Sequence, residues 1–331
     1  MKALVTGGGG FLGSAIVRQL LARGDEAVSF SRGEYPELAA LGVEQHRGNL
    51  TDLTALLEAS RGCDVVFHVA AKAGIWGSFE EYRLANLLGT ENVIAACRIH
   101  SIARLVYTGS PSVVFDGSDV EGGNESLPYP SHFQAHYPHT KALAEQAVLA
   151  ANSPKLATVS LRPHLIWGPG DNHLSPRILA RARAGKLRRI GRRPCLVDTV
   201  YVDNAAEAHL NAADRLAPGS PPAGKAYFIS NGEPLPLWEM VNRILAASGL
   251  PPESRFVPAT VAYAAGAVCE QIWSALHLSG EPPMTRFVAR ELASAHWFDI
   301  SAANLDLGYR PRVTIDEGLG RLHDWFVGGG R

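Results

Sequence analysis

Cysteine is scarce in this sequence, and no two cysteines stand at a spacing typical of a metal site or a redox pair. The chain has 331 residues and four cysteines, Cys63, Cys97, Cys195 and Cys269. Their scatter indicates neither a zinc cluster nor a CxxC redox couple nor a disulfide-rich miniprotein. We therefore expect buried, reduced thiols and chemistry without a bound metal.

An excess of charge of one sign is also missing. The 31 Lys and Arg residues are balanced by 32 Asp and Glu residues, which leaves a net charge of −1. This balance excludes an overall basic surface of the kind that attracts nucleic acid. No nucleic-acid partner is expected.

Long hydrophobic runs are absent as well. The first apolar residues run directly into glycines at Gly7, which leaves no room for the core of a signal peptide, so we expect a cytoplasmic location. In the stretch 256–280, Glu270 is the only formal charge, but it divides the stretch into runs too short for a transmembrane helix. Apolar residues surround any helix drawn there, which predicts burial under a lid or at a subunit interface, with peripheral membrane contact as the alternative.

What is present predicts a globular α/β protein. Hydrophobic residues make up 46% of the chain and charged residues 19%, enough for a substantial core. Strand-like segments at 3–5, 27–30, 43–46, 65–69, 105–107 and 158–161 alternate with helical patterns, among them 80–99 and 137–151. This alternation is typical of a doubly wound parallel sheet, the Rossmann arrangement.

The regular alternation stops after position 166. We predict a dinucleotide-binding Rossmann domain over 1–166, with returns to it near 196–231. The segments 167–195 and 232–331 would then form a smaller, irregular α/β region that binds the substrate.

Glycines follow the first strand at the point where a helix begins. Gly7 permits a tight turn, Gly10 allows close approach of a ligand, and Gly13 lets the helix pack on the strand. Backbone amides and the helix dipole at such a junction bind a pyrophosphate, so the motif predicts a dinucleotide cofactor.

The end of the second strand bears on which dinucleotide is bound. An NAD site carries an acidic residue there, about 20 residues beyond the glycines. This chain has Ser31 and Arg32 instead, a hydroxyl and a guanidinium that suit a 2′-phosphate. NADPH is favoured over NADH, unless Arg32 is only a solvated strand end.

Three polar residues are candidates for the chemistry. Tyr137 and Lys141 are four residues apart, so they share one face of a helix, and an ammonium near a phenol lowers the cost of forming phenolate. Ser110 ends the fifth strand at the same edge of the sheet and could hold a substrate oxygen, although Ser112 and Thr108 compete for that role.

These motifs together resemble the extended short-chain dehydrogenase/reductases of the NAD-dependent epimerase/dehydratase superfamily. The resemblance includes the glycine spacing, the segments 68–71, 86–92, 162–163, 168–171 and 201–204, and the set Ser110, Tyr137 and Lys141. It implies cofactor contacts from Phe11, Leu12, Asn49, Leu50, Ala70, Ala71, Asn86, Tyr137, Lys141 and Pro163. One departure is Asn49, where the family usually has Asp, so we expect altered contacts to the adenine but no loss of the site.

The resemblance also implies a mechanism. Tyr137 would give a proton to a carbonyl oxygen that Ser110 holds, and Lys141 would bind the nicotinamide ribose and lower the pKa of the phenol. Hydride transfer from the nicotinamide would complete the reduction.

Two segments resemble a particular branch of that family. Residues 72–77 and 110–117 are similar to the 3β-hydroxysteroid dehydrogenases, and more so to bacterial reductases that convert 2-alkyl-3-ketoalkanoic acids to 3-hydroxy acids in olefin biosynthesis. We therefore expect NADPH-dependent reduction of a hydrophobic 3-keto substrate. Aromatic residues near strand ends either line an apolar pocket for it or belong to the core: Trp76, Phe79, Phe115, Phe133 and Trp167.

Other functions stay open at this point. The chain is alternatively an NAD-dependent 3β-hydroxysteroid or sterol dehydrogenase, a nucleotide-sugar epimerase or reductase, or a non-enzymatic NADPH sensor, although such sensors tend to lack the Tyr and Lys pair. Eight basic residues between Arg177 and Arg193 form a patch that suits a substrate carboxylate, a sugar diphosphate, an acidic protein partner or plain solvent. The family resemblance further implies a homodimer.

Overall fold

The structure is a computed structural model that describes residues 1–330, and its centre is a parallel sheet of seven strands. The strand order is β12-β7-β5-β4-β1-β2-β3. The strands are β1 (Lys2–Thr6), β2 (Glu26–Ser31), β3 (Glu44–Arg47), β4 (Val65–His68), β5 (Arg104–Thr108), β7 (Ala157–Pro163) and β12 (Lys225–Ile229). The predicted doubly wound Rossmann sheet is confirmed.

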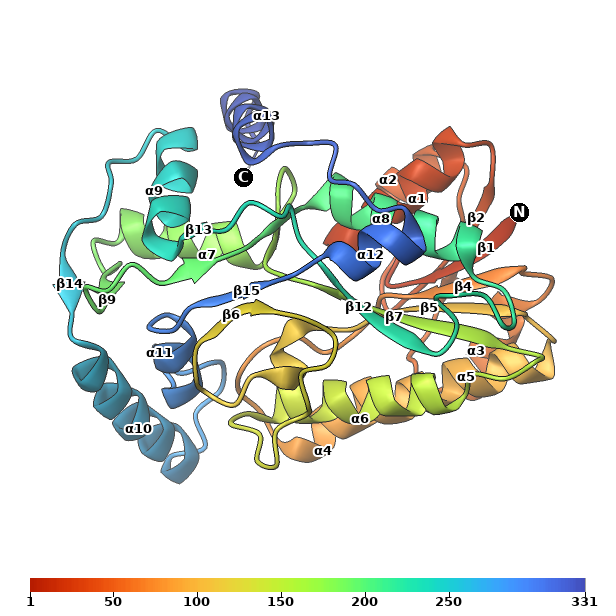
Figure 1. Cartoon of the computed structure of the whole chain (residues 1–331), viewed down its shortest axis with the longest axis horizontal. Helices are drawn as coiled ribbons and strands as arrows, with labels where there is room; N and C mark the ends of the chain where they lie inside the picture. Colours follow the sequence, from red (N-terminus) through yellow and green to blue (C-terminus); the bar gives the residue numbers. More distant parts are fainter. Residues whose placement is uncertain (331) are drawn as a thin grey trace.

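Helices cover both faces of this sheet (Figure 1). On one face lie α1 (Phe11–Ala22) and α8 (Val202–Arg215), and on the other α3 (Leu53–Ser60), α5 (Gly89–Ile99) and α6 (His136–Ala150). The short α2 (Pro36–Ala40) joins β2 to β3. Because both faces are covered, the central strands are buried along their whole length, as their near-continuous apolar runs predict.

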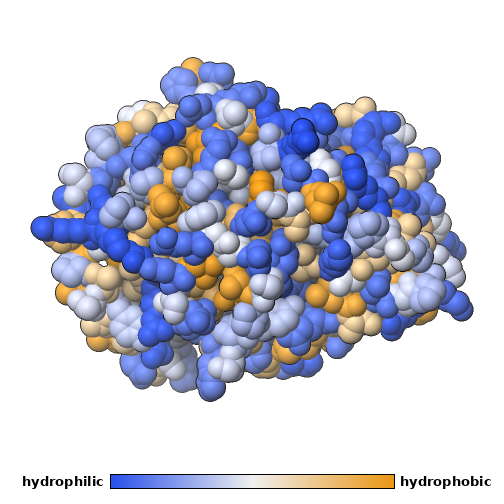
Figure 2. All heavy atoms as spheres, viewed as in Figure 1, coloured by the Kyte–Doolittle hydropathy of each residue, from blue (hydrophilic) through white to orange (hydrophobic). Residues whose placement is uncertain are grey.

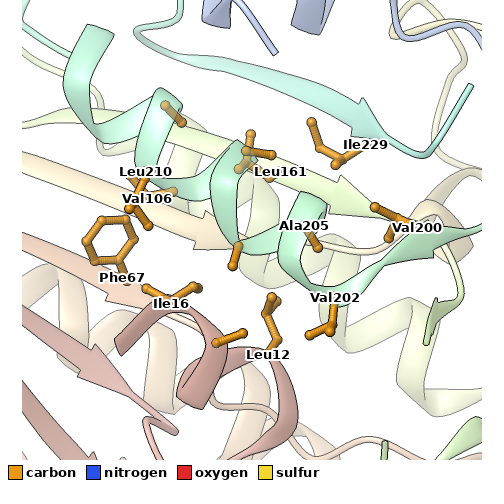
Figure 3. Packing of buried hydrophobic residues seen from close by; sticks show 14 of the residues in the cluster. Leu12, Ile16, Phe67, Val106, Leu161, Val200, Val202, Ala205, Leu210 and Ile229 are labelled. Atoms are coloured by element: carbon orange, nitrogen blue, oxygen red, sulfur yellow. The ribbon is translucent and has the colours of Figure 1, made fainter. Parts of the chain in front are cut away.

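The face under α1 and α8 is the larger core. Figure 3 shows Leu12 and Ile16 of α1 packed with Ala205 and Leu210 of α8 over Phe67 and the neighbouring strands. Each of these side chains is at most 6% exposed. This packing fixes the start of α1, and with it the glycine turn, against the carboxyl edge of the sheet.

The helix predicted over 80–99 is not continuous. It consists of α4 (Phe79–Tyr82), a π-helical turn η1 (Arg83–Leu88) and α5. A π-turn inserts an extra residue into a helix and is frequent at functional sites. Here it turns the side chain of Asn86 inward, where it is 2% exposed.

A second, smaller layer holds a four-stranded sheet in the order β13-β10-β15-β6. Its strands are β13 (Leu235–Pro236), β10 (Leu196–Val197), β15 (His296–Phe298) and β6 (Val120–Gly123). Two-residue strands form two further pairs, β8 (Ile166–Trp167) with β11 (Val200–Tyr201) and β9 (Arg189–Ile190) with β14 (Phe256–Val257). Around them lie the 3-10 turn η2 (Pro111–Val114), α7 (Leu174–Arg183), α9 (Leu237–Ala247), α10 (Ala259–Ala275), α11 (Arg286–Glu291), α12 (Ser301–Leu307) and α13 (Ile315–Val327).

The two parts of the chain are interleaved. β6 comes from the first part of the sequence but pairs with β15 near the end, and α12 packs against α8 and β12 of the large sheet. The predicted domain limits remain a prediction.

The segment 256–280 is largely exposed within this chain, and the predicted subunit interface or membrane contact there remains a prediction. α10 buries only Ala262 and Gly266, while Val268 is 58% exposed and Leu276 is 65% exposed. The helix packs closely on one neighbour, because Gly266 meets the backbone of Thr285 just before α11. One close contact cannot cover a helix that is apolar on all sides.

The outer surface is mixed in character. In Figure 2 the face toward the viewer carries hydrophilic and hydrophobic side chains in small areas. No helix within residues 1–330 combines the length and the apolar character needed to cross a bilayer.

Candidate active site

The glycine turn between β1 and α1 has the geometry of a dinucleotide cradle. Gly7 adopts a φ of +71°, and its carbonyl accepts a hydrogen bond from Gly10 N at 2.8 Å. A Cβ at Gly13 would lie 2.0 Å from Gly7 O, so only glycine fits there. The first turn of α1 has neither a side-chain cap nor an acidic residue. Its amides are therefore free for an anion, and the residues present fit a pyrophosphate.

The other residues expected at the glycine turn play backbone and packing roles. The side chain of Leu12 belongs to the core and Phe11 packs against it. Ala70 lies 3.1 Å from the position a Gly7 Cβ would take, so β1 and β4 approach closely here. Ala71 follows at the exposed edge.

Two guanidinium groups lie near the end of β2, one on Arg32 and the other on Arg47 of β3. Arg32 is exposed, and its carbonyl accepts a hydrogen bond from Arg47 Nε at 3.1 Å. Ser31 beside it is buried and pairs in register with Arg47 on β3. Sequence reading missed Arg47, because its proximity follows only from the pairing of β2 with β3.

Asn49, Leu50 and Asn86 hold the loops around the cleft. Asn49 Oδ1 accepts from Thr51 N at 3.2 Å, which shapes the turn after β3, and Leu50 is buried against Gly89. Asn86 accepts from Lys72 N at 2.7 Å and donates to Thr140 Oγ1 at 3.1 Å. The side chain of Asn86 thus ties the loop after β4 to the helix that carries Tyr137.

Lys141 is buried and held against the end of β5. It is 2% exposed, and its Nζ donates to Thr108 O at 2.6 Å and lies 4.1 Å from the centre of the Tyr107 ring. Burial lowers the pKa of Lys141 to about 7, and the negative charge of Glu145 raises it. Glu145 itself is paired with Arg162, one residue before Pro163 at the end of β7.

Tyr137 lies one helical turn before Lys141, in the first turn of α6. Burial raises the pKa of the Tyr137 phenol, while the neighbouring Ser110 hydroxyl lowers it. Tyr137, Lys141 and Ser110 therefore converge at the carboxyl end of β5, where ligands bind in open α/β sheets.

The three candidates for the third polar group differ in their partners. Thr108 Oγ1 is hydrogen-bonded to buried His209 Nε2 at 2.9 Å, so it faces the core. Ser112 Oγ lies 2.8 Å from Ser110 Oγ. Among the three, Ser110 is the one that perturbs the phenol of Tyr137.

A recess beside Ser110 contains residues that the sequence reading did not single out. His164, Glu291 and His296 come from three segments far apart in the chain, and no spacing in the sequence connects them. Ser112 and Phe115 line the same recess. The other aromatic candidates lie elsewhere, with Trp167 wholly buried in the main core and Phe133 stacked on His139.

Three of the eight residues in the predicted basic patch form ion pairs. Arg177 contacts Glu281 at 2.7 Å, Arg193 contacts Asp119, and Arg188 lies 3.8 Å from Glu253. These ion pairs reduce its attraction for a further anion.

Comparisons with known proteins agree with this geometry. Residues 4–259 match the model of the 3-beta hydroxysteroid dehydrogenase/isomerase family. The chain is 56% identical over 324 residues to a 2-alkyl-3-oxoalkanoate reductase of Stenotrophomonas maltophilia, covering 97% of this chain and 98% of the relative. It is 34% identical over 330 residues to the decarboxylating sterol-4-alpha-carboxylate 3-dehydrogenase of Mus musculus, covering 97% and 89%.

Solved structures share the whole fold. The UDP-glucose 4-epimerase of Thermus thermophilus in complex with NAD superposes with a TM-score of 0.75 at 26% identity, covering 99% of each chain. With the glycine cradle, the buried lysine and the tyrosine one turn before it, these matches show that the chain belongs to the 3-beta hydroxysteroid dehydrogenase/isomerase family and is an NAD(P)-dependent oxidoreductase of the extended short-chain dehydrogenase/reductase type.

Proposed function

We propose that this enzyme uses NADPH to reduce a long-chain 2-alkyl-3-oxoalkanoic acid to the 2-alkyl-3-hydroxy acid. The observation that carries the proposal is the placement of Tyr137 beside Ser110 and one turn before buried Lys141. This set can hold a carbonyl oxygen and give it a proton. The reductase that is 56% identical over nearly the whole chain supports the choice of substrate.

The residues of the chain divide the work as follows. The hydroxyl of Ser110 donates a hydrogen bond to the C3 oxygen and orients it. The phenol of Tyr137 gives that oxygen its proton, and the Lys141 ammonium stabilises the phenolate that remains. Bound NADPH supplies the hydride.

Cofactor binding falls to residues at the carboxyl edge of the large sheet. The amides at the start of α1, opened by Gly7, Gly10 and Gly13, would hold the pyrophosphate. Arg32 and Arg47 would hold a 2′-phosphate, with Ser31 as a neighbouring hydroxyl. This charge pattern supports NADPH, with NADH as the weaker cofactor.

The names of two relatives support a 3-oxo or 3-hydroxy acid. A 2-alkyl-3-oxoalkanoate and a 3-hydroxysterol-4-carboxylate both carry a carboxyl group two bonds from the carbon that changes oxidation state. The recess beside Ser110 is lined largely by apolar side chains, Pro111, Val114, Phe115, Val120 and Phe298. An apolar lining suits an alkyl or steroid substrate better than a sugar.

The second candidate function is oxidation of a 3-hydroxysteroid or sterol acid with NAD. The family match and the mouse relative favour it. A role in olefin biosynthesis, a cytoplasmic location and a homodimer belong to the first proposal, and no acidic protein partner or membrane contact is needed for it.

The deciding experiment follows absorbance at 340 nm with the purified protein and NADP+ or NAD+. The substrates are a 2-alkyl-3-hydroxyalkanoic acid, a 3β-hydroxysteroid and UDP-glucose. The hydroxy acids are used because 3-keto acids decarboxylate readily. We expect NADP+-linked oxidation of the hydroxy acid. Turnover of the steroid alone supports the second candidate, and turnover of none of the three contradicts both.

A further inference from the structure

The recess beside Ser110 contains polar groups but no fixed positive charge among its described lining residues. Its polar members are Ser112, His164, Glu291 and His296. Neither lysine nor arginine is among the residues that line it. A substrate carboxylate that enters the recess therefore meets imidazoles, a hydroxyl and another carboxyl.

Both imidazoles are fully used by the protein itself. His296 Nε2 must donate to Glu291 O at 3.0 Å, because a carbonyl can only accept. Burial lowers the pKa of His296 to about 4, so its Nδ1 carries no proton at neutral pH and accepts from His164 Nε2 at 3.2 Å. His164 Nδ1 is hydrogen-bonded to Asp198 Oδ1 at 2.5 Å. Neither ring has a free N–H for a ligand.

The carboxyl group of Glu291 is the polar group left over. It makes no side-chain hydrogen bond within residues 1–330, although it ends α11 and lines the recess. A negative charge on it raises the pKa of Tyr137. Burial raises the pKa of Glu291 to about 7. A half-buried acid that makes no side-chain hydrogen bond is one that a ligand can satisfy.

The groups that face Glu291 carry no unpaired positive charge. From α6 comes the phenol of Tyr137, and from β15 the neutral ring of His296. His164 is balanced by Asp198 behind it. On its own helix, Arg290 turns away to stack on Tyr263 of α10 at 5.0 Å. The remaining neighbours in the recess are Ser112 and apolar side chains.

We propose that this recess is the subsite for the carboxyl group of the substrate, and that Glu291 holds this group by sharing one proton between the two carboxyls. The inference rests on the proposed function and names the part of the site that selects an acid. With the C3 oxygen between Ser110 and Tyr137, the carboxyl carbon is two bonds from C3, and the recess begins at Ser112, whose Oγ lies 2.8 Å from Ser110 Oγ. A hydrogen bond between an acid and a carboxylate is short and strong, and the shared proton removes the repulsion between two anions.

Binding of the acid is then coupled to proton uptake. Above pH 7 the protonated fraction of free Glu291 falls about tenfold per pH unit, so the KM for the hydroxy acid should rise by the same factor. The KM for a secondary alcohol of equal chain length without the carboxyl group should not follow this pattern. With a pKa of about 7, binding should take up roughly 0.9 proton at pH 8 and roughly 0.1 at pH 6.

The test compares the full-length enzyme with Glu291→Gln. The amide keeps the shape and a hydrogen-bond donor but cannot titrate, so its KM for the hydroxy acid should stay flat from pH 6.5 to 9 while kcat follows the wild-type profile. Glu121, an exposed residue on β6, provides the matched control, and Glu121→Gln should keep the wild-type slope of KM against pH. Calorimetric titration of the NADP+ complex with the hydroxy acid, in two buffers of different ionisation heat, measures the proton uptake directly.

The outcomes separate this inference from the proposed function. Turnover of the hydroxy acid with equal pH slopes in wild type and Glu291→Gln overturns the subsite and leaves the function standing. Turnover of the alcohol alone shows that Glu291 excludes acids, which overturns both. If Glu291→Gln does not fold, the wild-type calorimetry decides, because binding without proton uptake at pH 8 overturns the inference.

Discussion

At the scale of single residues, the candidate site depends on a lysine that the fold shields from solvent. Lys141 is almost wholly buried and makes one hydrogen bond to a carbonyl, with the Tyr107 ring below it. Burial lowers the pKa of Lys141 to about 7, and the negative charge of Glu145 opposes this shift. The charge of Lys141 is therefore available beside Tyr137 in the neutral pH range.

Tyr137→Phe should lose turnover but keep the cofactor. Removing the proton donor typically costs about 10²- to 10⁴-fold in rate. We expect that loss in kcat and an NADPH dissociation constant within about twofold of wild type, measured by fluorescence titration, because phenylalanine keeps the packing. Tyr263→Phe, outside the site, is the control. A variant that keeps a tenth of wild-type turnover would contradict the assignment.

Arg32→Glu should change the choice of cofactor. A charge-assisted hydrogen bond contributes about 1.5–3 kcal/mol, so reversing the charge should shift the ratio of NADPH to NADH affinities by about tenfold or more toward NADH. The ratio of kcat/KM values for the two cofactors measures this. Arg61→Glu, an exposed residue outside the cofactor cleft, should leave the ratio unchanged. An unchanged ratio in Arg32→Glu would rule out Arg32 as the group that distinguishes them.

At the scale of elements, the start of α1 contributes both to the stability of the fold and to the binding of the cofactor. The helix is pressed so closely on the turn after β1 that Gly13 has no space for a side chain. The same closeness exposes the unpaired amides of the first turn to the cleft. Packing and anion binding therefore depend on one helix position.

Gly13→Ala should weaken both properties. The added methyl would stand 2.0 Å from Gly7 O, so α1 must shift, and we expect a lower Tm and at least about tenfold weaker NADPH binding. Gly320→Ala on α13 is the matched control, since no atom lies within 4 Å of its Cβ position. There the substitution should stabilise by about 0.5–1 kcal/mol, because alanine favours helix. Thermal unfolding and NADPH titration of both variants test the contrast.

At the scale of the whole molecule, buried neutral histidines connect the central strands. His68 lies between Thr6 Oγ1 at 2.8 Å and Thr90 Oγ1 at 2.9 Å, and thus links β1 to α5. His209 joins α8 to Thr108 on β5. Burial lowers the pKa of His68 to about 3 and that of His209 to about 4. Both rings must stay neutral for these contacts to persist.

This predicts a loss of stability in mild acid. Between the folded pKa values and about 6.5 the unfolded chain binds more protons, so the free energy of unfolding falls as the pH is lowered through this range. Each histidine contributes up to about 1.4 kcal/mol per pH unit. His209→Gln should reduce the slope by about one proton in denaturant titrations at pH 4.5–6.5. Exposed His132→Gln should not change it, and equal slopes in all three proteins would contradict the prediction.

The arrangement of α10 is also a property of the whole molecule. Its apolar residues predicted burial, yet Val268 and Leu276 face outward in the single chain. The sequence shows that the helix is apolar on all sides but not how many neighbours it has. In the folded chain α10 packs mainly against α11, and this tertiary arrangement leaves its other sides exposed.

The sequence by itself determined the features that depend on short spacings. Strand and helix alternation, the glycine cradle, and the Tyr137 and Lys141 pair follow from periodicity and from residues at most a few positions apart. These local rules act over short stretches of chain, so they can be applied without knowledge of distant contacts. That is why the fold class and the family were predictable.

The tertiary structure decided what depends on segments distant in the chain. It distinguishes Ser110 from Ser112 and Thr108, places Arg47 beside Ser31, and brings Glu291 into the recess next to Ser110. No local pattern specifies such encounters, because strand order and layer packing determine which side chains meet. The pKa values in the site follow from the same packing, since burial is a property of the assembled molecule.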